Sequence, residues 1–194
     1  MTWWAALTMS VHERSSEAVN LSRRSLVAFG ATAPLLLKGE GPALAAGTGD
    51  GVEPVPALEF ALEIIADLGD VEDMGVGPLG GRRIVPILGG TFQGPRIGGI
   101  VRPGGADRQL VRSDGVRHLS ALYELEAKDG AIITVLNKVL VENFADGSRY
   151  AFSTPEISAP KGPHDWLNHA VFVGTLGSLR PSRQAVRVRF YRLI

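Results

Sequence analysis

Residues 116–143 read VRHLSALYELEAKDGAIITVLNKVLVEN, and this stretch decides the fold. Its first half alternates apolar and polar side chains: Leu119, Ala121, Tyr123 and Leu125 against His118, Ser120, Glu124 and Glu126. A period of two predicts a strand over 116–127 with one face buried. Asp129-Gly130 is a tight-turn signal, so a second strand over 131–143 is predicted to fold back beside the first.

Similar runs recur on both sides of this hairpin. Strands are predicted over 57–66, 148–153, 167–174 and 184–193, and no helix is predicted in the body of the chain. Alanine, leucine and glutamate make a helix the competing interpretation of 57–66, but the alternation and the turn at Gly69-Asp70 favour a strand. Consecutive antiparallel strands joined by short turns predict a meander that closes into a barrel and leaves no exposed edge.

Glycines recur every few residues between 75 and 105, with short β-prone pieces at 83–88, 91–92 and 97–101 between them. The pair Gly89-Gly90 lets a strand bend sharply or approach another backbone closely. The corners of a barrel need such bends. The sequence therefore predicts an all-β fold, a single antiparallel barrel over 56–194.

Composition excludes several classes of function. Lysine plus arginine and aspartate plus glutamate number 20 each, so the chain lacks the basic excess of a nucleic-acid-binding protein. The absence of cysteine excludes disulfides, thiolate nucleophiles and cysteine metal sites. His164 and His169 are the only closely spaced histidines, and no third ligand is visible beside them. We therefore expect no metal, no cofactor and no nucleic-acid partner.

The beginning of the chain resembles an export signal. Arg23 and Arg24 precede an apolar run over 26–37, and Ala43 and Ala45 have the spacing of a signal-peptidase site. This pattern predicts a twin-arginine signal over 1–46, cleaved after Ala45 or Ala46, a flexible linker over 47–55, and export to the periplasm or beyond through the twin-arginine machinery. Met9 is an alternative start. An amphipathic or buried N-terminal helix is the competing interpretation, since Lys38 and Glu40 interrupt the stretch before the cleavage site.

Several motifs together resemble one known family. They are GRRIVPI at 81–87, GGTFQGP at 89–95, PGGAD at 103–107 and DWLN at 165–168, together with Arg112, Tyr123 and the turns at 114–115 and 129–131. This combination is similar to the family named domain of unknown function 3237 (DUF3237, also UPF0311). The resemblance covers roughly 57–193 and implies a barrel of the calycin or lipocalin type, with no assigned biochemical role. Arg108 and Leu122 stand where relatives often carry tryptophan and arginine, so ligand specificity does not transfer.

A barrel with an apolar lumen and a few polar groups is a common small-molecule site. The candidate residues are Asp107, Arg112, Asp114 and Tyr123, with Arg83, Phe92, His118, Trp166 and Asn168 around them. Asp107 could act as a general base if burial raises its pKa, and Tyr123 could donate to a carbonyl or phenolate oxygen. Arg112 could hold an anion.

Each candidate also has a purely structural interpretation. Asp107 and Asp114 are typical turn residues, and Tyr123 shares a face with Leu119 and so could simply pack in the core. Arg83 and Arg112 could form surface ion pairs, and Trp166 could pack under the loop at 159–163.

Three functions follow from these alternatives. The first is an exported barrel that binds a small, mostly apolar molecule. The second is a cofactor-independent lyase, isomerase or cyclase that uses a carboxylate and a tyrosine in the same cavity. The third is a structural or assembly protein whose barrel is filled with side chains. A homodimer is the default expectation for a small barrel.

Overall fold

The computed structural model describes residues 55–194 of the chain. The predicted signal, with Arg23, Arg24, Ala43 and Ala45, lies outside these residues, as does most of the predicted linker. Export therefore stays a prediction. Within the described residues, no helix has both the length and the apolar character needed to cross a membrane.

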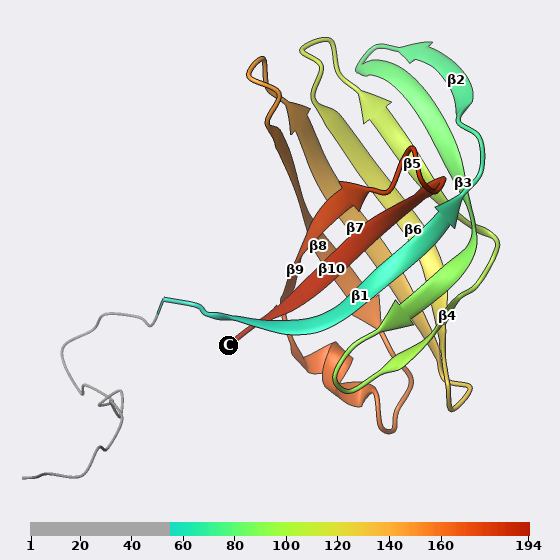
Figure 1. The fold of residues 1–194 in the computed structure, drawn as a ribbon, viewed down its shortest axis with the longest axis vertical. Coiled ribbons are helices and arrows are strands. Elements are labelled where there is room, and N and C mark those ends of the chain that lie inside the picture. Colours follow the sequence, from blue (N-terminus) through green and yellow to red (C-terminus); the bar gives the residue numbers. More distant parts are fainter. Residues whose placement is uncertain (1–54) are drawn as a thin grey trace, which may run out of the picture. The chain divides into compact units, whose positions relative to one another are not determined.

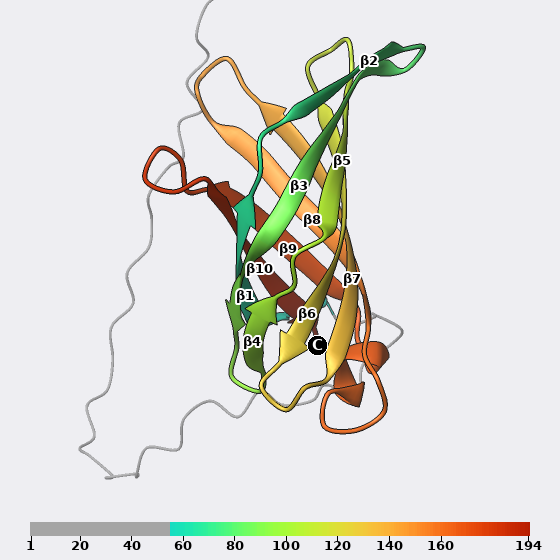
Figure 2. The same ribbon diagram turned by 90° about the vertical axis from the view of Figure 1, so that its right-hand side faces the viewer.

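Ten strands and one 3-10 helix make up residues 55–194. They are β1 (Leu58–Leu68), β2 (Glu72–Gly77), β3 (Gly80–Gln93), β4 (Gly98–Val101), β5 (Gly105–Val111), β6 (Arg117–Ala127), β7 (Ile132–Asn143), β8 (Arg149–Ser158), η1 (Asp165–His169), β9 (Phe172–Ser178) and β10 (Ala185–Leu193). All neighbouring strands are antiparallel. From β6 to β10, each strand pairs with the next one along the chain, and β10 then pairs with β1. β1 also pairs with β3, and this pairing closes the sheet into a barrel (Figures 1 and 2). The predicted all-β antiparallel barrel is confirmed.

β3 is one long bent strand that joins two parts of the barrel. Its first half pairs with β2 and β5, and its second half pairs with β1 and β4. β4 and β5 both pair with β6 as well, so together they occupy one strand position between β3 and β6. The bend lies at Gly89 and Gly90, whose φ angles are 141° and 138°. A Cβ atom at Gly90 would overlap the carbonyl oxygen of Ile65 in β1, so glycine permits the closing contact.

The predicted strand over 167–174 is wrong in its first half. Residues Asp165–His169 form η1, and β9 begins only at Phe172. Side-chain bonds hold this turn: Asn168 Oδ1 accepts from the Ala159 amide at 2.8 Å, and its Nδ2 donates to the Ala159 carbonyl at 2.9 Å. η1 also buries Leu167, which is 2% exposed, so an apolar residue here reflects packing at the end of the barrel and not a strand.

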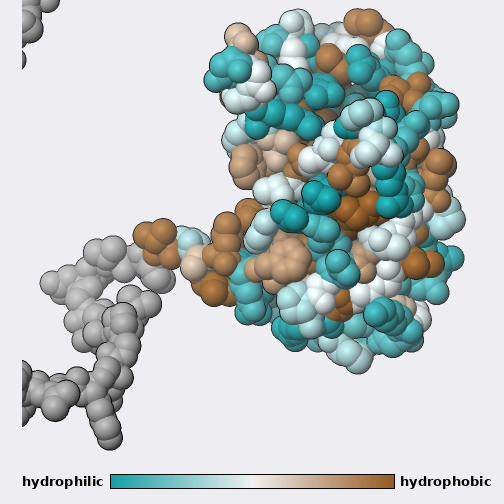
Figure 3. Space-filling view, in the orientation of Figure 1, coloured by the Kyte–Doolittle hydropathy of each residue, from teal (hydrophilic) through white to brown (hydrophobic). Residues whose placement is uncertain are grey.

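The barrel is filled at one end and hollow at the other. At the end covered by η1, large side chains fill the interior, among them Leu62, Ile64, Phe92, Leu125, Ile133, Leu167, Phe172 and Phe190. The hairpins β2–β3, β5–β6 and β7–β8 lie at the opposite end (Figure 1). On the face that Figure 3 shows, apolar side chains lie in small groups among hydrophilic ones.

Candidate ligand cavity in the barrel

A cavity of about 370 Å³ occupies the hairpin end of the barrel. Its walls are mainly small or branched apolar side chains from six strands: Ala66, Leu68, Val85, Ile87, Leu119, Ala121, Val139, Leu176, Val186 and Val188. Alternation along each strand points these residues inward. A barrel filled with side chains, the structural alternative, would have no such space.

Asp107, Tyr123 and Asn137 form the buried polar part of this cavity. Strand pairing places Asp107 beside Ala121 and Ala121 beside Asn137. Asp107, Ala121 and Asn137 therefore lie in one row across β5, β6 and β7. Tyr123 comes two residues after Ala121 and lies on the same face of β6. A Cβ atom added at Gly105 would lie only 2.6 Å from the Cβ of Tyr123. Gly105 therefore leaves the room that Tyr123 occupies. Asp107, Tyr123 and Asn137 are 9%, 3% and 2% exposed.

Each of these three side chains has a buried polar atom without a partner. The Oδ1 atoms of Asp107 and Asn137 and the hydroxyl of Tyr123 form no hydrogen bond within residues 55–194. The other carboxylate oxygen of Asp107 accepts from Gln109 Nε2 at 2.7 Å. Buried polar groups are normally bonded, and leaving one unpaired costs about 1–3 kcal/mol. Three of the seven such atoms in residues 55–194 lie around this one cavity, which makes it the candidate site.

Burial sets the protonation of the two acidic groups. It raises the pKa of Asp107, against the opposing effects of the Gln109 hydrogen bond, the Ser120 backbone hydrogen bond and the Arg117 charge. Burial also raises the pKa of Tyr123 well above its ordinary value, and the Asp107 charge adds to this rise. Tyr123 is therefore a neutral phenol at physiological pH and can donate its proton in a hydrogen bond. Asp107 is the group in the cavity that could accept a proton.

The structure separates the four residues that the sequence grouped first. Asp107 and Tyr123 line the cavity, and so does Arg83. Arg112 and Asp114 instead form an exposed ion pair at the β5–β6 turn and do not line the cavity. The reason is local: Asp114 Oδ1 accepts from the Val116 amide at 3.1 Å, which fixes the turn beyond the end of the barrel wall.

The remaining candidates also lie apart from the cavity. Phe92 is 3% exposed in the filled end of the barrel, and Asn168 holds η1 to the end of β8. Trp166 packs in η1 against Phe172, with the Arg96 guanidinium 4.3 Å from its ring centroid. These three side chains stabilise the closed end and do not face the hollow end.

Sequence reasoning missed Asn137, Arg117 and Arg149 as cavity residues. A signal for Asn137 was present: in 131–143 it takes a place in the inward row otherwise held by Ile133, Val135, Val139 and Val141. A polar residue at an apolar position of a half-buried strand indicates either a buried hydrogen bond or a site. The arginines gave no comparable signal, because their position at the mouth depends on strand register.

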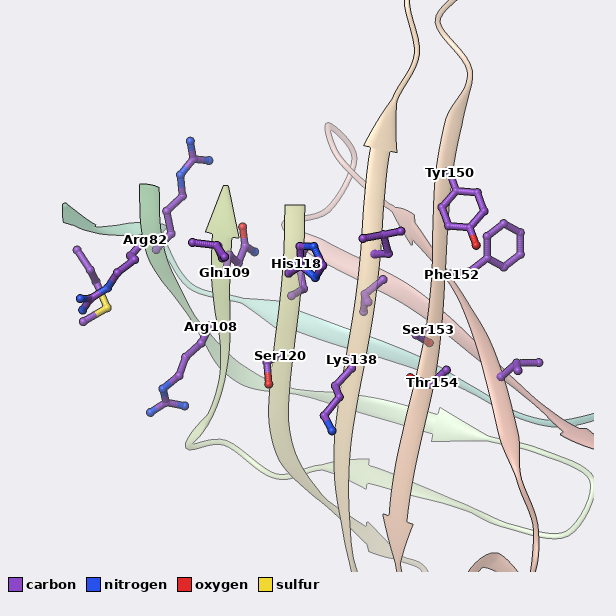
Figure 4. A pocket seen from close by; sticks show the side chains of 17 residues that line it. Arg82, Arg108, Gln109, His118, Ser120, Lys138, Tyr150, Phe152, Ser153 and Thr154 are labelled. Atoms are coloured by element: carbon purple, nitrogen blue, oxygen red, sulfur yellow. The ribbon is translucent and has the colours of Figure 1, made fainter. Parts of the chain in front are cut away.

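A larger hollow of about 990 Å³ lies along the same strands, mainly on their outer face, and its lining shares Arg83, Gln109, Leu119 and Val139 with that of the cavity. Figure 4 shows Arg82, Arg108, His118, Lys138, Tyr150 and Phe152 along it. Arg108 and Lys138 directly follow Asp107 and Asn137 in sequence, so they point to the opposite face of the wall. Lys138 and Phe152 are exposed. Of the buried unpaired side-chain atoms, only Ser153 Oγ belongs to the lining of this outer groove, whereas those of Asp107, Tyr123 and Asn137 belong to the cavity, so we take the cavity as the candidate site.

The two histidines at metal spacing have separate partners. His164 Nε2 lies 3.1 and 3.0 Å from the two carboxylate oxygens of Asp129, and His169 Nε2 lies 3.3 Å from Asp165. Within residues 55–194, no group of three or more histidine, aspartate or glutamate side chains is arranged to hold a metal ion. The bond between His164 and Asp129 ties the loop before η1 to the β6–β7 turn.

Fold and site together define a small closed antiparallel barrel with an internal, mostly apolar cavity and a few buried polar groups. The chain belongs to the DUF3237 family, described as proteins of unknown function, whose sequence pattern matches residues 56–193. This confirms the resemblance found in the sequence. A UPF0311 protein of Rhodopseudomonas palustris is 44% identical over 135 residues, which cover 62% of this chain and 88% of the relative.

Solved structures show the same fold. A β-barrel-like protein of Acinetobacter baumannii has a TM-score of 0.69 and 30% identity, covering 74% of this chain and 99% of the other. A protein of unknown function from Clostridium acetobutylicum has a TM-score of 0.66 and 26% identity, covering 71% and 99%. An enzyme from Penicillium herquei has a TM-score of 0.60 over 74% and 99% of the two chains, and at 21% identity this likeness shows the fold alone.

Replacing Asp107 with asparagine is expected to stabilise the free protein at neutral pH. Burial raises the pKa of Asp107 in the folded protein above its value of about 3.9 in the unfolded chain. The free energy of unfolding of the wild type therefore falls as the pH rises from the unfolded-state pKa towards the folded-state pKa, because the folded protein resists the loss of this proton. At about pH 3 the carboxyl is largely protonated in both states, so the variant and the wild type should be almost equally stable. Urea unfolding should show a gain in stability at pH 7 that disappears near pH 3.

The control is Asp114→Asn on the exposed turn. The amide hydrogen bond from Val116 is the largest cause that lowers the pKa of Asp114, so its ionised form stabilises the fold and this variant should lose stability at pH 7. A loss of stability at pH 7 in Asp107→Asn would contradict the account of a buried carboxylate that opposes folding.

Proposed function

We propose that the protein binds a small, mostly apolar molecule inside the hairpin end of the barrel. The observation that carries this proposal is the trio of unpaired buried atoms on Asp107, Tyr123 and Asn137 around an apolar-walled cavity. The volume of about 370 Å³ falls within the range of ordinary ligand pockets, roughly 300–1,000 Å³. A ligand hydroxyl could accept from Tyr123 and donate to Asp107 or Asn137, while the rest of the ligand contacts the walls.

A thermal-shift screen of the full chain against a metabolite library tests this proposal. A ligand that binds only the folded state stabilises it by about 2.7 kcal/mol at a hundredfold excess over the dissociation constant. Ala121→Phe adds bulk inside the cavity and should abolish these shifts. Leu122→Phe is the matched control, since Leu122 is the next residue along β6, points outward and is 45% exposed. Ligands that still stabilise Ala121→Phe would place binding elsewhere and refute the proposal.

Acid–base catalysis in the same cavity is the second candidate function. The observation that favours it is a buried carboxyl group, Asp107, on the same cavity wall as the neutral phenol of Tyr123. The two do not bond to each other, since Asp107 Oδ1 and the Tyr123 hydroxyl both lack partners. A substrate lying between them could lose a proton to Asp107 and receive a hydrogen bond from Tyr123. Turnover of a screened ligand that Asp107→Asn binds without converting would establish this role, and turnover that survives Asp107→Asn would exclude it.

The periplasmic location, the twin-arginine machinery as a partner and the homodimer stay predictions. None of them is needed for the binding proposal, because every residue on which it rests belongs to one protomer and lies within residues 55–194.

A further inference from the structure

Four arginines line the cavity around its single carboxyl group. They are Arg83, Arg117, Arg149 and Arg180, and the only acidic residue among the lining is Asp107. Six other arginines pair with carboxylates on the described surface: Arg102, Arg112, Arg183, Arg187, Arg189 and Arg192. The four at the cavity form no ion pair within residues 55–194. The cavity lining therefore carries four arginines against one carboxyl group, an excess of positive charge; Arg117 is half-buried and the other three are exposed.

Arg117 and Arg149 are the two of these that strand pairing brings together. Arg117 pairs with Val141 and Arg149 pairs with Asn143, so the two arginines flank the end of β7 on the inward face. Burial lowers the pKa of Arg149, and the like charge of Arg117 lowers it further. An anion between them would remove this repulsion, and guanidinium groups bind carboxylates through paired hydrogen bonds.

The backbone of this pair lies at a different level of the barrel from the row of Asp107 and Asn137. Arg117 precedes Ala121 by four residues on β6, and Ala121 lies in the same row as Asp107 and Asn137. Four residues of strand span about 13 Å at the usual rise of 3.3 Å per residue. Apolar side chains such as Leu119 and Val139 lie between the two polar levels. A molecule that meets both levels therefore has an apolar body between a hydrogen-bonding end and an anionic end.

We propose that the ligand is an amphiphilic anion whose carboxylate, or another compact oxyanion, binds between Arg117 and Arg149 at the mouth while its apolar body enters the barrel. This inference rests on the proposed binding function and adds the chemical class of the ligand. It also gives both sets of polar groups in the cavity a partner: the anionic group would face the arginines, and the oxygen-bearing end of the ligand would reach Tyr123 and Asn137.

A matched pair of fluorescent dyes tests this inference on the full chain. Anilinonaphthalene sulfonate carries an anionic group, and phenylnaphthylamine has the same apolar rings without it. The wild type should bind the sulfonate dye about tenfold or more tightly than the uncharged dye, as expected from charge-assisted hydrogen bonds. Arg117→Gln and Arg149→Gln should each remove most of this difference and leave the affinity for the uncharged dye unchanged.

Arg108→Gln is the control for the outer groove. It removes the same charge from the opposite face of the barrel wall, where Arg108 lines the outer groove, and it should change neither affinity. A sulfonate affinity that falls in Arg108→Gln but not in Arg117→Gln would place the dye outside the barrel and overturn the inference. Unfolding curves without dye check the fold: Arg149→Gln should be at least as stable as the wild type at low salt, because it relieves the repulsion.

The remaining outcomes separate the two proposals. If both dyes bind equally and Ala121→Phe abolishes both, the binding function stands and the anionic ligand is refuted. If neither dye binds and the metabolite screen gives no shift that Ala121→Phe removes, the binding function fails, and the anionic ligand fails with it.

Discussion

Gly90→Ala is expected to lower the free energy of unfolding by roughly 3–5 kcal/mol, the sum of backbone strain and steric overlap. Gly90 has a φ of 138°, which side-chain-bearing residues rarely adopt, and an added Cβ would overlap the Ile65 carbonyl oxygen. This is the place where β3 meets β1 and closes the barrel. Either the strands separate there or the bend relaxes, and both weaken the closing contact.

Gly89→Ala separates the two causes. Gly89 has nearly the same φ of 141°, but the nearest atom to its added Cβ is the Val101 carbonyl oxygen at 3.6 Å, an ordinary contact. It should cost only the backbone strain, about 1–3 kcal/mol. Urea unfolding of both variants gives the comparison. Equal losses in the two variants would show that the approach to Ile65 does not limit barrel closure.

The same glycine pair shows how far the sequence predicts the fold. Alternation with a clear turn correctly predicted the strands at 116–127 and 131–143, and the glycines correctly predicted a bend. The sequence did not predict β2 or β5, because glycines break the period of two within β2 and the inward row of β5 carries Asp107 and Gln109 in place of apolar residues. Those polar residues belong to the cavity, so the pattern failed where the candidate site begins.

Strand register decides which parts of the candidate site could not be predicted from the sequence. Asp107 and Tyr123 were candidates for their chemistry alone, whereas their placement with Asn137 depends on the pairing across β5, β6 and β7. Arg112 and Arg117 differ by five positions on either side of one turn, yet only Arg117 lines the cavity. A sequence shows which residues alternate, but it does not show where each hairpin turn ends relative to the barrel wall.

Side-chain size divides the interior into its filled and hollow ends. β6 passes through both: Leu125 lies in the filled end and is 1% exposed, whereas Ala121 and Leu119 line the cavity. Small residues at 66 and 121 leave space that phenylalanines occupy at 92 and 190 in the other end. The filled end therefore supplies the packing that stabilises a barrel whose other end contains the cavity.

Leu125→Ala should accordingly destabilise the protein by about 4 kcal/mol, the usual cost of removing a leucine from a tightly packed core. Leu119→Ala truncates the same residue type on the same face of the same strand, six residues nearer the mouth. Because Leu119 already borders the cavity, its removal enlarges an existing space and opens no new void, so the loss should be about 2 kcal/mol. Urea denaturation at one pH measures both. Losses of the same size would mean that side chains pack as tightly at the hairpin end as at the η1 end, and the cavity would then be no place for a ligand.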